Sequence, residues 1–113
     1  MEILSFVGPA GRPVDAHGSV GVTALALFRG EAVAVTVLRV AAGGEVGRHC
    51  APVDQLLMVT EGRGVVQSGD GDWESVSAGQ MVMWRAGEEH TTSAVDDLTA
   101  VVVEIAATPP RGG

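Results

Sequence analysis

Glycine residues divide this chain into short segments, and this spacing limits what it can fold into. The chain has 16 glycines in 113 residues. The segments between them are rich in Val, Ala, Leu and Thr. Short β-branched segments with a turn residue every ~8–12 positions are typical of an all-β sandwich or barrel. No stretch of about ten residues shows the 3.6-residue apolar period of a helix. We therefore expect an all-β fold.

The same pattern predicts nine strands in one domain. Gly69-Asp70-Gly71-Asp72 predicts a hairpin turn, because Gly and Asp tolerate positive φ. The last six residues offer little apolar surface to bury, so residues 1–107 are expected to form the domain and residues 108–113 a disordered tail. The strands are expected near residues 2–7, 20–29, 32–41, 54–61, 63–68, 72–76, 80–85, 90–95 and 98–107.

Composition excludes several classes of partner. The net charge is −7, and all seven cationic residues are arginines scattered along the chain. An acidic chain without a basic stripe repels phosphate backbones and anionic membrane surfaces, so we expect no nucleic-acid or membrane partner. The apolar runs are far shorter than the roughly 20 residues of a membrane helix. No secretory signal is visible, so a cytoplasmic location is expected.

Two of the three histidines stand where expected strands end or begin. His49 precedes the strand expected at 54–61, and His90 begins the strand expected at 90–95. Each follows a glycine-bearing turn. A pair of imidazoles from two strands that face a common interior forms a minimal metal site or acid–base site. A single histidine is more often a hydrogen-bonded structural residue, so the spacing around the pair decides between these interpretations.

The spacing resembles the two motifs of the cupin superfamily. The first motif reads Gly, five residues, His, one, His, three or four, Glu, six, Gly. The second reads Gly, five residues, Pro, one, Gly, two, His, three, Asn. Both spacings are kept here without a gap, although some of the specified residues differ. The positions that correspond to the first motif are Gly43, His49, Ala51, Gln55 and Gly62, and those for the second are Gly79, Arg85, Gly87, His90 and Ala94.

The resemblance implies a double-stranded β-helix, or jelly-roll, barrel with a pocket at one end. In this family two histidines and a glutamate of the first motif, with the histidine of the second, hold a metal ion. By position, His49, Gln55 and His90 stand where ligands stand, and Ala51 stands where one is missing. The implied cofactor is one divalent ion (Fe, Mn, Ni, Zn or Cu). Alanine has no donor atom and a carboxamide has no charge, so this set binds more weakly than three histidines and a carboxylate.

Two further residues allow more than one interpretation. Cys50 follows His49, but strand alternation turns it away from that imidazole, so a buried small apolar residue is favoured over a nucleophile or soft ligand. Glu104 lies in the apolar segment 98–107, on the same face as Leu98, Ala100 and Val102. If that face is buried, the carboxylate needs a partner, and Arg39 is one candidate.

Three functions remain open from the sequence. The first is a metal-dependent enzyme for a small organic molecule, of the dioxygenase, isomerase or cyclase type, with the ion at His49, Gln55 and His90. The second is a metal-free module that binds a small ligand in the barrel. The third is a structural homodimer whose pocket is vestigial. A homodimer is expected in each case because small cupins commonly pair, and the sequence names no substrate.

Overall fold

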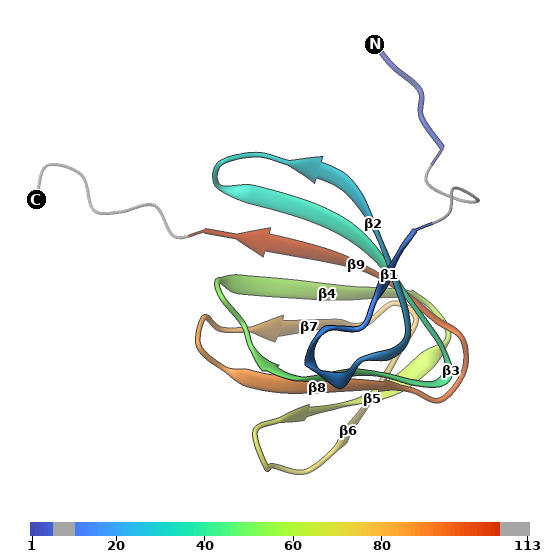
Figure 1. Ribbon diagram of the computed structural model, residues 1–113, viewed down its shortest axis with the longest axis vertical. Helices are drawn as coiled ribbons and strands as arrows, with labels where there is room; N and C mark the ends of the chain where they lie inside the picture. The colour runs from blue at the N-terminus through green and yellow to red at the C-terminus, as the bar shows by residue number, and fades with distance from the viewer. Residues whose placement is uncertain (6–10, 107–113) are drawn as a thin grey trace, which may run out of the picture.

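The computed structural model describes residues 1–5 and 11–106, and these form an all-β fold (Figure 1). One short 3-10 segment, η1 (Ala16–Gly18), accompanies the strands. The strands within these ranges are β1 (Arg12–Val14), β2 (Val20–Arg29), β3 (Val33–Cys50), β4 (Asp54–Glu61), β5 (Arg63–Ser68), β6 (Glu74–Ser77), β7 (Met81–Trp84), β8 (Glu89–Ala94) and β9 (Leu98–Ile105).

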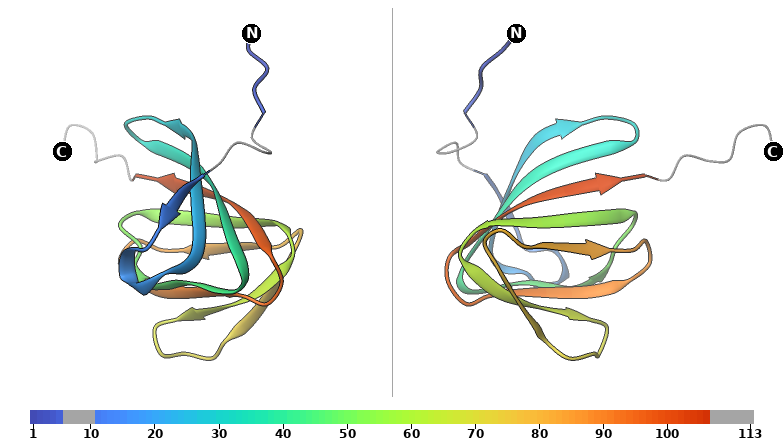
Figure 2. Two further views of the ribbon diagram at one scale, coloured as in Figure 1. Left: turned by 45° about the vertical axis from the view of Figure 1, so that its right-hand side comes forward. Right: turned by 180° about the vertical axis from the view of Figure 1, so that it is seen from behind.

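The strands form one antiparallel sheet that curls into a nearly closed barrel (Figure 2). The order is β6-β5-β8-β3-β9-β4-β7, with β2 added to β3 and β1 to β2. Strand β3 bends because its two halves have different partners: residues 33–40 pair with β9, and residues 45–50 pair with β8. A register shift between Val46 and His49 accompanies the bend. This arrangement confirms the jelly-roll, double-stranded β-helix barrel.

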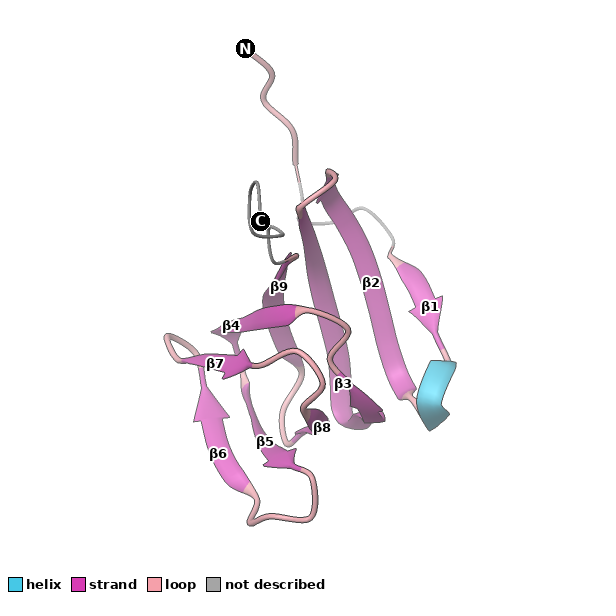
Figure 3. Cartoon of the chain, turned by 90° about the vertical axis from the view of Figure 1, so that its left-hand side faces the viewer, coloured by secondary structure: helices cyan, strands magenta, loops and turns pink. Residues whose placement is uncertain are grey.

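The expected strands are largely confirmed, with three corrections. Residues 2–5 form no strand, and the rest of the strand expected at 2–7 lies outside the described residues. Strand β1, which no sequence pattern indicates, pairs with β2 at one side of the molecule (Figure 3). The strand expected to end at residue 41 runs on to Cys50, because Gly43 and Gly44 lie within it and do not form a turn. The tail expected at 108–113 also lies outside the described residues.

The core fills the barrel with small and medium aliphatic side chains. Leu98 and Ala100 of β9 are fully buried, and Val37 and Val40 of β3 are nearly so. Trp84, at the end of β7, is 4% exposed and is the largest member of the cluster. Among the described residues, no helix is long and apolar enough to cross a membrane. Apolar packing accounts for the core of the barrel, and the polar side chains of the barrel interior need a separate explanation.

Candidate functional site

The barrel brings the two motif histidines into direct contact. His49 lies near the end of β3 and His90 lies on β8, and they are opposite each other in the antiparallel register. Residues directly opposite share a face of the sheet. The ring centroids are 4.2 Å apart, and the planes are tilted by 58°. The pair of facing imidazoles that the sequence predicted is therefore present.

Backbone carbonyls fix the orientation of both imidazoles. His49 Nδ1 lies 2.7 Å from the Gly47 carbonyl oxygen, and His90 Nδ1 lies 3.2 Å from that of Glu88. A carbonyl oxygen can only accept, so each Nδ1 donates, and in the neutral form of either ring Nε2 is the nitrogen that carries the lone pair. Burial lowers the pKa of His90, and the neighbouring His49 lowers it further, although the Glu88 carbonyl opposes this shift. His90 is therefore a neutral imidazole near pH 7.

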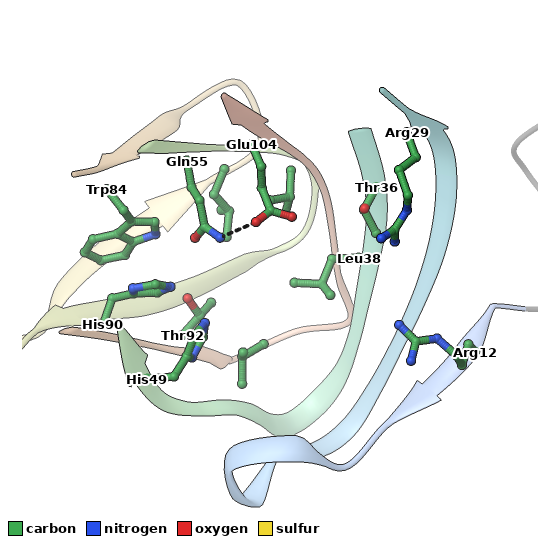
Figure 4. A pocket seen from close by; sticks show the side chains of 13 residues that line it. Arg12, Arg29, Thr36, Leu38, His49, Gln55, Trp84, His90, Thr92 and Glu104 are labelled. Carbon is green, nitrogen blue, oxygen red and sulfur yellow. Dashed lines mark hydrogen bonds between the residues drawn. The ribbon is translucent and has the colours of Figure 1, made fainter. Parts of the chain in front are cut away.

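Gln55 belongs to a row of side chains across three strands. On β4 it pairs in register with Trp84 of β7 on one side and with Glu104 of β9 on the other. Gln55 Nε2 donates a 3.0 Å hydrogen bond to a carboxylate oxygen of Glu104. The amide oxygen consequently lies on the side that faces Trp84 and His90 (Figure 4). Glu104 is partly buried on the face predicted for it, and its partner is Gln55.

A third histidine, which neither sequence motif includes, completes an aromatic stack. His17 of η1 stacks on His49 with centroids 4.9 Å apart, and Trp84 stacks on His90 at 4.6 Å. Gly47 permits this approach: a Cβ built there would lie 1.7 Å from the carbonyl oxygen of His17. The left-handed backbone of His17 (φ 58°) gave no sequence signal, because only glycine is expected there routinely.

His49, Gln55, Trp84 and His90 line one cavity of about 230 Å³. Figure 4 shows these four side chains on one side, and Arg12 on β1 and Arg29 on β2 on the other. The cavity therefore has a polar interior between apolar walls, as small-molecule sites do. The lining residues are Leu38, Val46, Leu57, Trp84 and Val102, with the polar residues Arg12, Arg29, Thr36, His49, Gln55, His90, Thr92 and Glu104.

The residues of the first motif come from more than one strand, and the expectation for the neighbouring Cys50 needs correction. The β3 strand ends at Cys50 and β4 begins at Asp54, so residues 49, 51 and 55 do not share one continuous strand. His49 and Gln55 nevertheless reach the same cavity from different strands, and Ala51 is buried in the core. Cys50 was expected to be buried, but it is exposed and outside the cavity lining, because it lies at the strand end.

The donor atoms at this site do not fit the four-ligand metal centre that the motifs imply. The site offers two imidazole Nε2 atoms and the uncharged oxygen of Gln55, while Ala51 has no donor. In residues 1–5 and 11–106, no group of three or more His, Cys, Asp or Glu side chains could hold a metal ion. Divalent metal sites usually include thiolate, carboxylate or further imidazole ligands. A weaker centre at His49, Gln55 and His90 stays a prediction.

The fold and the cavity define a class: small β-barrel domains with an internal pocket lined by histidines. The family model for the cupin domain (Cupin_2) matches residues 36–106. This match covers more than half of the chain and includes both motifs. The chain belongs to the cupin domain family. No curated protein has a sequence that matches it.

Solved structures show the same fold at low sequence identity. The polyketide cyclase RemF from Streptomyces resistomycificus superimposes with a TM-score of 0.81 and 21% identity, over 97% of this chain and 82% of that one. A predicted oxalate decarboxylase from Thermotoga maritima gives a TM-score of 0.82 and 22% identity, over 95% of this chain and 100% of that one. At these identities the similarity establishes the barrel and not the chemistry.

Proposed function

We propose that this cupin binds a small organic molecule in its barrel cavity and that His49 and His90 transfer protons to and from that molecule. The observation that carries the proposal is the facing imidazole pair, with each Nδ1 bound to a backbone carbonyl and each Nε2 left free to accept a proton. Neutral His90 is suited to the role of base, because burial lowers its pKa.

The chemistry that suits this pair is isomerisation or cyclisation. A proton leaves the carbon or hydroxyl of the bound molecule for one Nε2, and a proton then returns to a different atom of the molecule. The imidazoles end the cycle unchanged, so the step needs no oxidant or reductant. One structural neighbour is a polyketide cyclase, and an acid–base pair is compatible with such a reaction class.

Ligand binding is tested by a thermal-shift screen of small acids, sugars and aromatic compounds. A ligand that binds only the folded chain, at about 100 times its Kd, stabilises it by about 2.7 kcal/mol, which raises Tm by on the order of 10 °C. Replacing Thr36, which lines the cavity, with Trp should fill the space and abolish the shift. The matched control is Thr60→Trp on the exposed end of β4, which should keep the shift.

Circular dichroism of both variants shows whether the barrel is intact. A ligand that stabilises Thr36→Trp as strongly as the wild type binds elsewhere and contradicts the proposal. If no compound in a broad library shifts Tm, the vestigial pocket of a structural homodimer becomes the better explanation. The homodimer and the cytoplasmic location stay predictions from the sequence.

The second candidate function is a metal-dependent enzyme with one divalent ion at His49, Gln55 and His90. The Nδ1 contacts to carbonyl oxygens favour it, because metal-binding histidines usually donate their other N–H in this way. Titration with Fe, Mn, Ni, Zn or Cu should then give uptake that His49→Ala abolishes. Cys50→Ser is the matched control and should retain uptake. Binding below about a tenth of an equivalent would exclude this candidate.

A further inference from the structure

The cavity contains a buried hydrogen-bond donor that has no partner. Trp84 is 4% exposed. Among the described residues, its indole Nε1 is the one buried side-chain nitrogen or oxygen atom that makes no hydrogen bond. Figure 4 shows the nitrogen-bearing edge of this indole facing Gln55 and the cavity. Leaving a buried donor unpaired costs about 1–3 kcal/mol, so native proteins usually satisfy such groups. A ligand oxygen that accepts from Nε1 would satisfy this one.

The far side of the cavity carries two arginines whose charges are not neutralised within the described residues. Arg48, Arg63 and Arg85 form ion pairs with carboxylates, whereas Arg12 and Arg29 line the cavity and have no ion pair in residues 1–5 and 11–106. This is notable in a chain of net charge −7. Figure 4 shows both guanidinium groups directed toward the cavity from β1 and β2.

The one carboxylate of the lining does not neutralise these arginines. Glu104 accepts its hydrogen bond from Gln55. Arg29 is opposite Ala34, and Ala34 is opposite Glu104, so two strand spacings, or about 10 Å, separate the two backbones. Two arginines and one glutamate give the lining a formal charge of +1, not counting the histidines. The cavity therefore favours an anion.

The walls between the two polar ends are apolar, and the space is small. Leu38, Leu57 and Val102 are among the residues that line it. Its volume of about 230 Å³ exceeds the ~150 Å³ of a cavity that takes benzene and is below the ~300 Å³ at which pockets for drug-sized ligands begin. This size fits a compound with about one ring.

We propose that the ligand is a small carboxylic acid with an apolar, ring-sized body and a second oxygen at its far end. The carboxylate lies at Arg12 and Arg29, and the second oxygen accepts a hydrogen bond from Trp84 Nε1. The free Nε2 atoms of His49 and His90 lie on the same side as Trp84. They therefore act on the end of the ligand that carries the second oxygen, and not on its carboxylate end. This inference rests on the proposed function and specifies its substrate class.

The first experiment measures Kd by calorimetry for 4-hydroxybenzoate, 4-hydroxyphenylacetate and 4-hydroxycinnamate, which place the two oxygens at increasing separations. Each is compared with its amide, which lacks the negative charge, and with the acid that lacks the hydroxyl group. We expect at least one hydroxy acid to bind about tenfold more tightly than its amide. Arg12→Gln and Arg29→Gln should each remove most of that preference. Arg63→Gln, whose guanidinium pairs with Asp96, is the matched control and should keep it.

The second experiment isolates the indole N–H. Trp84→Phe keeps an aromatic ring but removes the donor, so the preference for a hydroxy acid over the corresponding acid without hydroxyl should fall by about threefold to tenfold. Any general damage to the cavity lowers both affinities and cancels in this ratio. Trp73→Phe, an exposed tryptophan in the β5–β6 connection, is the matched control and should leave the ratio unchanged.

A third measurement does not depend on a change within the cavity. Trp73→Phe leaves Trp84 as the sole tryptophan, so its indole N–H gives one resonance in a ¹⁵N-resolved NMR spectrum. This resonance should move downfield with the hydroxy acid and much less with the acid that lacks the hydroxyl group. Equal shifts, or equal binding of acids and amides, would overturn the inference. If other compounds bind but none of these acids does, the substrate class is wrong while the proposed function stands; if nothing binds, both fail.

Discussion

At the scale of single residues, each imidazole of the site owes its properties to its immediate neighbours. His90 lies between the indole of Trp84 and the ring of His49, and it is 4% exposed. The apolar surroundings disfavour the charged form, and the Glu88 carbonyl holds the ring in one orientation. The same burial that keeps His90 available as a base also makes the stability of the barrel depend on pH.

We predict that His90→Phe removes part of the acid sensitivity of this protein. The ordinary pKa of 6.5 applies in the unfolded chain, and the pKa in the folded chain is lower. Between these two values the unfolded chain binds more protons, so the free energy of unfolding decreases as the pH falls below 6.5. Phenylalanine keeps a ring against Trp84 but cannot be protonated. Urea denaturation at about pH 7.5 and about pH 5.5 should show a smaller loss of stability for the variant.

The control for this measurement is His17→Asn, because asparagine also tolerates the left-handed backbone at this exposed position. It should keep the wild-type loss of stability on acidification. An equal loss in His90→Phe and in the wild type would show that His90 is not the group that is protonated on unfolding.

Part of this site could be predicted from the sequence, because the spacing of the two motifs is kept even where their residues differ. His49, Gln55 and His90 reach one cavity although Ala51 contributes no donor. The neighbours that give these residues their chemistry could not be placed in the same way. His17 reaches His49 through a left-handed turn, and Arg29 reaches the cavity through strand register. Such contacts depend on how the sheet closes, which local patterns do not encode.

At the scale of elements, tight glycine turns hold the strands in register. Gly62 alone links β4 to β5, with φ of +76°. A Cβ at this position would lie 2.1 Å from the carbonyl oxygen of Asp97, in the connection that leads into β9. Glycine is thus required here both by the backbone conformation and by the close approach of another chain segment.

We predict that Gly62→Ala destabilises the barrel by at least about 3 kcal/mol, because the clash with backbone adds to the strain of the left-handed conformation. Gly69→Ala separates the two effects, since Gly69 also has positive φ (+51°) but nothing lies within 4 Å of its Cβ position. It should cost only about 1–2 kcal/mol. Urea midpoints of the two variants test this difference, and equal losses would mean that the approach of Asp97 carries no cost.

The strands themselves were predictable where alternation and turn residues agree, as in the segments that form β4, β5 and β9. The prediction was wrong at β3, where the glycine-bearing segment before His49, which includes Gly43 and Gly44, is expected to form a turn. Gly43 has φ of +80°, yet the strand continues through it because new pairing partners on β8 take over from those on β9. Glycine in a strand marks a bend as readily as an end, and sequence alone does not distinguish them.

At the scale of the whole molecule, one buried row of β9 joins the two sides of the barrel. Strand β9 pairs with β3 on one side and with β4 on the other. Leu98, at its start, is fully buried, and a Cβ at Gly64 of β5 would lie 2.9 Å from its Cδ1 atom. Leu98 therefore packs on β5, a strand with which β9 does not pair. Its side-chain contacts join two strands that backbone hydrogen bonds do not connect.

We therefore predict that Leu98→Ala lowers the stability of the entire domain by about 2–5 kcal/mol, the usual cost of a cavity at a buried leucine. A domain of this size has only ~5–15 kcal/mol in total, so the loss should appear as one cooperative transition shifted to lower urea. The matched control is Val95→Ala in the exposed turn before β9, which should change stability by less than about 0.5 kcal/mol. Circular dichroism and Trp84 fluorescence in the Trp73→Phe background should give the same midpoint. Separate midpoints for the two signals would show that the half of the barrel around the cavity unfolds on its own, and that Leu98 does not unite the two sides.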